Sequence, residues 1–373
     1  MESIIGEALK RGDLSCRTKA GRAVPRSKVD EELEEVLSQL SSKIVVVGSG
    51  GAGCNTITRM MEIRIEGATT IAMNTDAQDL ICSYADEKIL IGKMLTKGRG
   101  AGSMPHIGEE AAIESEKDIH KALDGADIVF LTCGLGGGTG TGSLPIVAGI
   151  AKKVGALTVA VVTFPFAMEG IRRKENAEMG LDKLRKEADT VIVIPNDRLL
   201  EIAPRLPLEA AFKVADEILV RAVKGITELI TKPGLINLDF ADVKAIMEGG
   251  GVAMIGMGES NSENRAMEAI DKAINSPLLS VDITGAKGAL INVIGGGDLT
   301  LEESERVVEV VSQRLDPKAN IIWGSVVDPD MEGVLRVMLV VTGVRSKQIL
   351  GQKPHVAPEE RSLKRELGID FID

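Results

Sequence analysis

The chain repeatedly places an apolar run rich in β-branched residues before a turn and a helix-like segment. Five such runs occur, at residues 43–48, 68–74, 127–133, 157–165 and 190–195. Continuous apolar runs of this length are typical of parallel strands that are buried on both faces. Because these strands alternate with helices, the pattern predicts a doubly wound, Rossmann-like α/β domain over residues 38–207.

Beyond this domain the pattern changes to a long helix and a second set of strands. Residues 208–230 hold no proline and carry apolar positions along one broad face, which predicts one continuous central helix. Strand and helix patterns then alternate again and predict a second α/β domain over residues 231–345. At the two ends we expect an N-terminal extension, 1–37, with one amphipathic helix, and a flexible tail, 346–373, with the apolar tip LGIDFI.

Composition excludes several classes of protein. The formal net charge of -11 and the aromatic content of 2% argue against nucleic-acid binding, which needs cationic surfaces and stacking platforms. No apolar run approaches the roughly 20 residues that cross a bilayer, so we expect a cytoplasmic protein with no membrane span. The four cysteines and three histidines show no metal-ligand spacing. The sequence therefore predicts neither a disulfide framework nor a zinc site, and any metal ligands stay unknown.

The first glycine-rich turn follows the first strand. In GSGGAGCN, residues 48–55, Gly48, Gly50 and Gly53 fit a GxGxxG phosphate loop, in which the backbone comes close to phosphate oxygens at a helix N-terminus. Asp76, after the second strand, stands where an acid that binds ribose would stand in a dinucleotide enzyme. Taken alone, this loop fits a dinucleotide-dependent oxidoreductase.

A second glycine-rich turn changes this interpretation. GLGGGTGTGS, residues 134–143, also follows a strand and opens a helix, and Thr139 and Thr141 add hydroxyl donors to its amide groups. Two such loops on neighbouring strands can hold a polyphosphate from two sides. The sequence contains neither GxxxxGK[ST] nor NKxD, so it is not a Walker-type nucleotide binder.

GGGTGTG is the tubulin signature, and further motifs appear in a matching order. They are NTDAQDL (74–80), GKMLTKGRGAGSMP (92–105), FPFAMEGIRR (164–173), PNDR (195–198) and NLDFADVKAIM (237–247). Over roughly residues 40–345 the chain resembles the FtsZ family of the tubulin superfamily. The resemblance implies a tubulin/FtsZ-like fold, GTP hydrolysis, assembly into filaments and a role in cell division.

The resemblance also implies which residues bind GTP or GDP. They are Gly50, Gly51, Ala52, Gly53, Asn55, Asn74, Gly100, Ala101, Gly102, Gly136, Gly137, Gly138, Thr139, Gly140, Thr141, Gly142, Glu169, Arg173, Asn196 and Asp216. Within this set, the loop of Gly100–Gly102 would close over the γ-phosphate, and Asn196 and Asp216 would bind the guanine edge. Glu169 and Arg173 stand one helical turn apart and would face ribose and phosphate, although their spacing fits a surface ion pair equally well.

The resemblance places catalysis at the contact between two subunits. Asn237, Asp239 and Asp242 would enter the nucleotide pocket of the next subunit and position the attacking water there. From the local sequence alone, Asp239 is better interpreted as a helix N-cap with Asp242 in the first turn, where acids suit the helix dipole.

The remaining implications concern cofactors and partners. The resemblance implies Mg²⁺ as a cofactor and leaves room for a monovalent cation. It also implies head-to-tail self-association, a membrane-tethering division protein that binds the tip LGIDFI, and a location at mid-cell. Two alternatives stay open, the oxidoreductase and a tubulin-like cytoskeletal GTPase that is not dedicated to division.

Overall fold

The computed structural model describes residues 42–63, 65, 67–202, 207–231, 239–279, 283 and 286–344. The predicted N-terminal helix, the tip LGIDFI and Asn237 lie outside these residues. Among the described helices, none is both long enough and apolar enough to cross a membrane.

The described strands form one ten-stranded sheet, in the order β3-β2-β1-β4-β5-β6-β7-β10-β8-β9. They are β1 (Ile44–Ser49), β2 (Ala68–Asn74), β3 (Glu87–Leu90), β4 (Ile128–Gly134), β5 (Leu157–Phe164), β6 (Thr190–Pro195), β7 (Gly251–Ser260), β8 (Gly288–Gly295), β9 (Asn320–Val327) and β10 (Leu335–Thr342). The first six strands are parallel, in the order of a doubly wound fold. All five apolar runs are confirmed as strands. The sequence missed β3, because this short edge strand is largely exposed and half polar.

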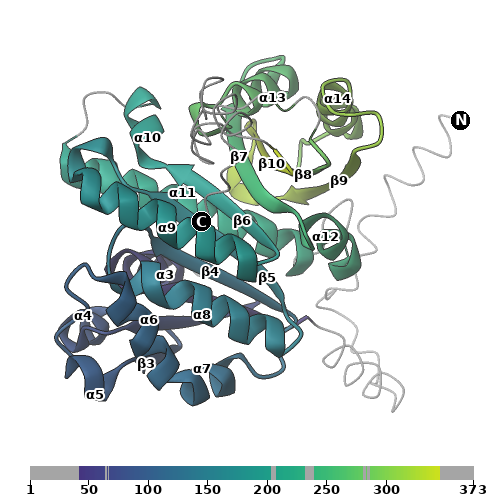
Figure 1. Cartoon of the computed structure of the whole chain (residues 1–373). Helices are drawn as coiled ribbons and strands as arrows, with labels where there is room; N and C mark the ends of the chain where they lie inside the picture. The colour runs from purple at the N-terminus through teal and green to yellow at the C-terminus, as the bar shows by residue number, and fades with distance from the viewer. Residues whose placement is uncertain are drawn as a thin grey trace, which may run out of the picture. The chain divides into compact units, whose positions relative to one another are not determined.

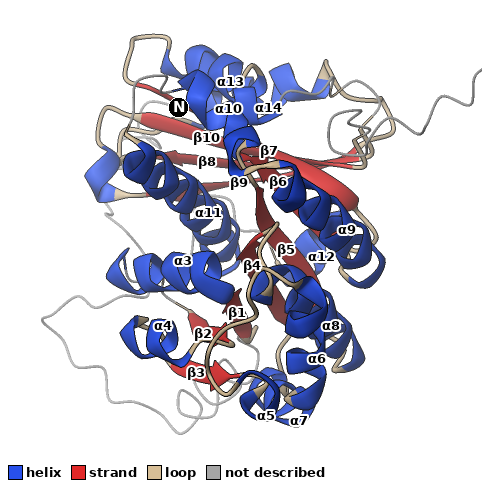
Figure 2. Ribbon diagram, turned by 60° about the vertical axis from the view of Figure 1, so that its left-hand side comes forward, coloured by secondary structure: helices blue, strands red, loops and turns tan. Residues whose placement is uncertain are grey.

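Helices cover both faces of the sheet (Figure 1, Figure 2). They are α3 (Gly50–Ile63), α4 (Ala77–Cys82), α5 (Lys93–Thr96), α6 (Pro105–Glu114), α7 (Glu116–Leu123), α8 (Thr139–Lys153), α9 (Ile171–Glu187), α10 (Asn196–Ile202), α11 (Leu208–Thr231), α12 (Phe240–Met247), α13 (Arg265–Ile274) and α14 (Leu301–Ser312). Short 3₁₀ turns lie at Ala167–Glu169, Pro277–Leu279 and Pro329–Met331.

Alternate residues of the parallel strands supply two separate cores. On β1, Ile44 and Val46 pack with α3, α11 and α12, whereas Val45 and Val47 pack with the helices of the opposite face, α6 to α9. This alternation is the two-residue period of a strand with both faces buried. It places α3 and α8, which follow the two glycine loops, on opposite sides of the sheet.

The C-terminal strands extend the same sheet. β7 pairs in parallel with β6 and antiparallel with β10, and β8 lies between β10 and β9. A third core forms between these strands and α13 and α14. The predicted alternation of strands and helices in this region is confirmed. The domain boundaries themselves stay predictions.

The central helix α11 runs from the carboxyl ends to the amino ends of the parallel strands. It has 24 residues, close to the predicted range, and is therefore about 36 Å long. Phe212 and Asp216, near its start, line a cavity at the carboxyl ends of the strands. Thr231, its last residue, lies against Gly67, directly before β2, at the amino ends of the strands. The helix thus extends along the full length of the parallel strands.

Glycine allows α8 to pack closely on α6, and this contact yields a stability prediction. A Cβ at Gly142 would overlap the carbonyl oxygen of Pro105 and lie 2.6 Å from the amide nitrogen of Glu109. Gly142→Ala should therefore lower the free energy of unfolding by about 1–3 kcal/mol, as overpacking does. Denaturant titration measures this change.

Gly149→Ala on the same helix is the matched control. An added Cβ there would meet only the carboxylate end of Glu187, a flexible side chain that can move aside. We expect this substitution to be neutral or slightly stabilising, because alanine favours helix more than glycine does. Equal effects of the two substitutions would contradict the packing argument.

Candidate functional site

The turn between β1 and α3 is shaped by contacts that only glycine permits. A Cβ at Gly53 would lie 2.7 Å from the carbonyl oxygen of Thr132 on β4, so Gly53 brings α3 close to the sheet. Gly50 has a φ of 72° and makes the sharp turn into the helix. Gly50, Gly51 and Ala52 line a cavity, whereas Gly53 lies behind them.

The second glycine loop lies beside the first. A Cβ at Gly140 would lie 2.9 Å from the carbonyl oxygen of Ser49, at the end of β1. The hydroxyl groups of Ser49 and Ser143 are 2.6 Å apart, which links the two loops directly. The amide of Gly136 donates to Thr141 Oγ1 at 2.9 Å and closes the turn. The predicted convergence of the two loops is thus present.

A cavity of about 280 Å³ opens at the carboxyl ends of β1, β4, β5 and β6. Eleven of the predicted binding residues line it, together with Ser49, Gly134, Leu135, Thr163, Pro165, Phe212 and Ala215. The eleven are Gly50, Gly51, Ala52, Gly137, Gly138, Thr139, Gly140, Glu169, Arg173, Asn196 and Asp216. The N-termini of α3 and α8 both open onto the cavity, which favours an anionic group there.

At the other end of the cavity, two polar side chains offer hydrogen-bonding groups. Asn196 is only 5% exposed, and its Oδ1 has no hydrogen-bond partner among the described residues. A buried oxygen without a partner carries a cost that a ligand donor would remove. Burial raises the pKa of the Asp216 carboxyl to about 6, while Arg59 and the Thr56 hydroxyl act in the opposite direction.

Phe212 is a cavity residue that the sequence analysis missed. It stands on α11 four residues before Asp216 and packs edge-to-face on Phe166, with ring centroids 5.4 Å apart. The residue is 39% exposed, so part of it remains open for contact. The chain has only six phenylalanines, so one that stands a helical turn before the predicted binding residue Asp216 was the available signal.

Glu169 and Arg173 form the predicted ion pair, but not along one helix, because Glu169 ends the 3₁₀ turn and Arg173 lies in the first turn of α9. The other carboxylate oxygen, Glu169 Oε1, accepts a 2.9 Å hydrogen bond from the amide of Phe166 and holds the preceding loop. The Glu169 side chain is mostly covered, whereas that of Arg173 is 49% exposed. Arg173 therefore retains donors that can reach an anion in the cavity.

The loop of Gly100–Gly102 packs against the second glycine loop but does not line the cavity. A Cβ at Gly138 would lie 2.9 Å from the Cβ of Ala101 and 2.9 Å from the amide nitrogen of Met104. Asn176 on α9 donates to the carbonyl oxygens of Ser103 (3.3 Å) and Gly136 (3.4 Å). The two loops are thus packed and bonded together at one side of the cavity.

Five other predicted binding residues lie outside the cavity lining, and four of them support the loops. Gly136 and Thr141 close the second turn, and Gly142 lies between α8 and α6. Asn74 is buried, donates to Asp79 at 2.6 Å and accepts from the amide of Thr75. Asn55 stands exposed on the second turn of α3.

Asp76 has a structural role in this fold. Its Oδ1 accepts hydrogen bonds from the amides of Gln78 and Asp79 and caps the N-terminus of α4. The position after the second strand, which resembled a ribose-binding acid, is therefore accounted for by helix capping.

The acidic pair lies far from the cavity. Asp239 caps α12, where it accepts from the amide of Asp242 at 2.8 Å, as the local sequence predicts. The last residue of this helix, Met247, accepts a hydrogen bond from the hydroxyl of Thr190, the first residue of β6. The helix thus belongs to the amino ends of the strands, opposite the cavity (Figure 1).

The described residues hold no group of three or more His, Cys, Asp or Glu side chains that could bind a metal ion.

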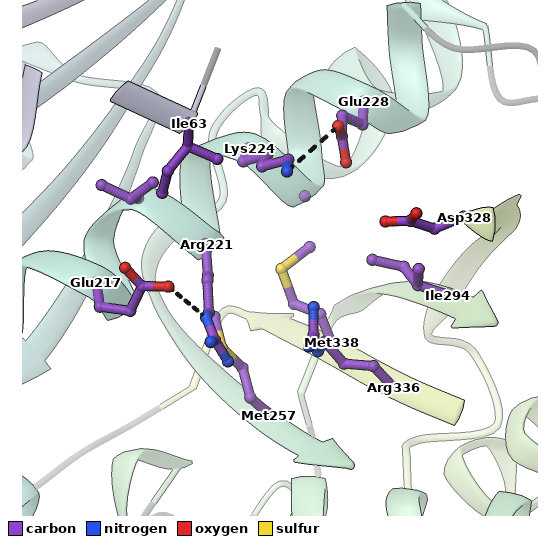
Figure 3. A pocket seen from close by; sticks show the side chains of 12 residues that line it. Ile63, Glu217, Arg221, Lys224, Glu228, Met257, Ile294, Asp328, Arg336 and Met338 are labelled. Atoms are coloured by element: carbon purple, nitrogen blue, oxygen red, sulfur yellow. Dashed lines mark hydrogen bonds and ion pairs between the residues drawn. The ribbon is translucent and has the colours of Figure 1, made fainter. Parts of the chain in front are cut away.

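A second cavity lies between α11 and the C-terminal strands (Figure 3). Its cations are paired with acids: Arg221 with Glu217 at 2.9 Å and Lys224 with Glu228 at 3.9 Å. Because these charges are compensated, this cavity offers less attraction to a polyphosphate than the glycine-lined one.

Sequence similarity assigns the chain to a protein family. "Cell division protein FtsZ 1" of Thermococcus kodakarensis is 59% identical over 371 residues, which cover 100% of this chain and 99% of the relative. The chain belongs to the FtsZ family. A family model described as "Tubulin/FtsZ family, GTPase domain" matches residues 43–204, and one described as "FtsZ family, C-terminal domain" matches residues 251–345. The cavity therefore lies mainly in a GTPase domain of the tubulin/FtsZ type.

Other FtsZ relatives agree with this assignment. "Cell division protein FtsZ 1" of Pyrococcus abyssi is 62% identical over 91% of each chain. The structure "FtsZ dimer, empty (M. jannaschii)" is 63% identical, covers 85% of this chain and 93% of that chain, and has a TM-score of 0.82. CetZ2 of Haloferax volcanii, 22% identical with a TM-score of 0.71 over 88% of this chain and 100% of that chain, shares the fold. The comparisons give the oxidoreductase alternative no support.

The raised pKa of Asp216 predicts a pH-dependent stability. Its folded-state pKa of about 6 lies above the ordinary value of 3.8, so the folded chain binds this proton more tightly than the unfolded chain. The contribution of Asp216 to the free energy of unfolding therefore falls as pH rises from about 4 to 6.

Asp216→Asn should remove this loss. We expect the variant to gain about 2–3 kcal/mol relative to the native chain between pH 4 and pH 7. Denaturant titration of both proteins at several pH values measures the difference. A difference that stays constant over this range would contradict the assignment.

Proposed function

We propose that this chain is a cell-division GTPase that assembles head to tail and completes each active site with acids from the next subunit. The observation that carries the proposal is the separation of the two halves of the site. The cavity lies at the carboxyl ends of the parallel strands, and Asp239 lies on a helix at their amino ends. A chain so built cannot bring its own acids to its own nucleotide.

In this proposal the cavity binds GTP or GDP along its length. The phosphates lie against the amides of the two glycine loops, at the N-termini of α3 and α8. The guanine lies at the far end, where Asn196 Oδ1 and the carboxylate of Asp216 accept from its N–H groups. Phe212 offers a ring surface to the base, and Glu169 and Arg173 bind ribose and phosphate. Asn55 and Asn74 support the base and phosphate ends.

The triphosphate would also supply ligands for the proposed Mg²⁺ ion. Because the described residues hold no cluster of metal-ligating side chains, the ion would take its ligands chiefly from phosphate oxygens and water. Bound there, Mg²⁺ would neutralise charge that develops on the phosphates during transfer. A monovalent cation remains a second candidate near the same oxygens.

The surface around the cavity is suited to receive another subunit. Met168 is 71% exposed and Ile171 is 78% exposed, and they flank the cavity residue Glu169. Met104, beside Gly138, is 41% exposed. A second copy that docks its amino-end edge here would cover these apolar side chains. Such a contact joins two different surfaces, so it repeats without closing and produces a filament.

Within the contact, the neighbour's acids act on water. Asp239 and Asp242 of the neighbouring copy, together with Asn237, would hold a water in line with the γ-phosphate and accept its proton. The glycine-loop amides would hold the phosphates during the transfer. Positioning and charge stabilisation of this kind account for most catalysis of phosphoryl transfer.

The proposal extends to the cell. Filaments of this chain would form the division ring in the cytoplasm at mid-cell. The tip LGIDFI would bind a membrane-tethering division protein, since apolar residues interleaved with an acid suit a partner groove. Nucleic acid is not among the proposed partners, because the chain carries a net charge of -11. The domain boundaries proposed above, with the acidic loop opening the second domain, fit this arrangement.

Base recognition predicts a preference for GTP over ATP. Adenine presents its amino group and ring acceptors differently, so Asn196 Oδ1 and the Asp216 carboxylate would each lose a donor. We expect ATP to be hydrolysed at least about 100-fold less efficiently, because unpaired buried polar groups penalise the wrong ligand. Phosphate release from each nucleotide measures this. Equal kcat/KM values for GTP and ATP would contradict the assignment of the guanine site.

The shared site predicts complementation between two inactive variants. Asp239→Asn keeps the helix cap, since asparagine also accepts at this position, but should lose hydrolysis by roughly 10²- to 10⁴-fold. Gly138→Val, whose Cβ would clash with Ala101, should lose nucleotide binding but keep its acids. Mixed in one filament, the two should recover part of the turnover.

Co-sedimentation of the mixture checks that both variants enter the filament. Asp328→Asn, another aspartate that caps a turn, is the matched control and should hydrolyse GTP normally. If the mixed filament hydrolyses no more GTP than the two variants alone, the site is not shared between subunits.

A further inference from the structure

The loop of residues 97–103 has an unusual backbone. Lys97 and Ser103, at its two ends, are the non-glycine residues with a left-handed φ among those described, at 54° and 60°. Gly98, Gly100 and Gly102 between them also have positive φ. Such conformations persist only where the surroundings hold them, and they occur often at ligand clamps.

The main chain of Thr75 is hydrogen-bonded to this loop and to Thr96, just before it. Its carbonyl oxygen accepts from the amide of Gly100 at 3.2 Å and from the hydroxyl of Thr96 at 3.3 Å. The amide of Ala77 donates to the carbonyl oxygen of Gly98 at 3.1 Å. The centre of the strained loop is thus fixed to the segment that follows β2.

The side chain of Thr75 connects to the cavity. Thr75 is completely buried, and its hydroxyl lies 2.7 Å from Thr139 Oγ1. Thr139 lines the cavity at the start of α8, whereas Thr75 does not reach it. Asn74 fixes Thr75 further, because its Oδ1 accepts from the Thr75 amide at 2.8 Å.

We propose that Thr75 is a positioning residue that makes the closure of loop 97–103 depend on the terminal phosphate of the bound nucleotide. The inference rests on the proposed binding of GTP and deepens it. A hydroxyl donates one hydrogen bond and accepts others. When a phosphate oxygen accepts from Thr139, Thr139 Oγ1 becomes the acceptor for the hydroxyl of Thr75, and the two bonds form one polarised chain.

The other contacts of the loop cannot serve in this way. Ala101 packs on Gly138 through a methyl group, and Asn176 bonds two carbonyl oxygens of the main chain. Neither contact uses a side chain that lines the cavity. The Thr75 hydroxyl is the link, among the described contacts, that runs from a cavity-lining side chain to the segment that carries the loop. The exposed Met104 follows directly, so the order of the loop reaches the proposed subunit contact.

Thr75→Val removes the hydroxyl and keeps the shape, while Thr75→Ser restores the hydroxyl. Thr158→Val is the matched control, because Thr158 is as completely buried as Thr75. Its hydroxyl donates to the nearby carbonyl oxygen of Ala156 at 3.2 Å and has no contact with the cavity. Dissociation constants for GDP and for a non-hydrolysable GTP analogue are measured on dilute subunits. Hydrogen exchange of a peptide that covers residues 97–104 is followed in both nucleotide states.

We expect Thr75→Val to bind GDP within about threefold of the native chain and the GTP analogue about tenfold more weakly, the scale of one lost hydrogen bond to a charged network. The native loop should exchange more slowly with the GTP analogue than with GDP, and Thr75→Val should abolish this difference. Thr75→Ser should recover both properties, and Thr158→Val should behave as the native chain.

Equal weakening for both nucleotides, or a nucleotide-dependent exchange that survives in Thr75→Val, would overturn the inference and leave Thr75 with a purely structural role. Failure of Thr75→Ser to recover would do the same. A native chain that binds neither guanine nucleotide would instead overturn the proposed function, so the two failures are distinguishable.

Discussion

Close packing of glycine against main chain is the constraint on which the site depends. At Gly53 and Gly140 an added Cβ would lie within 3 Å of a carbonyl oxygen of a neighbouring strand. These contacts bring α3 and α8 against the ends of β1 and β4 from opposite faces of the sheet. Only then do two helix N-termini point into one cavity, and the hydroxyl pair of Ser49 and Ser143 fixes their spacing. A loop of ordinary residues would hold the helices apart and leave a phosphate with one set of amides.

The long helix α11 gives the site its second property, the separation of its parts. Its first turns contribute Phe212 and Asp216 to the cavity, and its last residue lies at the amino ends of the strands. A helix of this length is stiff, so the cavity at one end and the acids beyond the other are held apart by a nearly constant distance. The same distance, repeated from copy to copy, would set the spacing of a filament. In the proposed shared site, assembly and hydrolysis become one event, because the acids would arrive only with a neighbour.

Much of this was readable from the sequence, and the reasons for the rest are physical. Apolar β-branched runs located the buried strands, and two glycine loops located the cavity. The short strand β3 escaped, because its exposed edge position removes the apolar signal. Phe212 escaped because helical periodicity does not show what lies opposite an exposed ring. The glycine pattern does not distinguish Gly138, which lines the cavity, from Gly142, which allows close helix packing. At both positions a Cβ would overlap neighbouring atoms, so both require glycine. Asp76 showed the converse, because capping of α4 explains an acid that resembled a ribose ligand.

The dependence of GTP turnover on protein concentration distinguishes a site shared between subunits from a self-contained one. The shared site predicts almost no hydrolysis per subunit in dilute solution, a threshold at which filaments appear by light scattering, and a steep rise in the rate per subunit beyond it. The lone subunit should still bind GTP below the threshold, because its cavity is complete for binding. A rate per subunit that is constant from the dilute monomer to the assembled filament would contradict the shared site, even if GTP were the substrate.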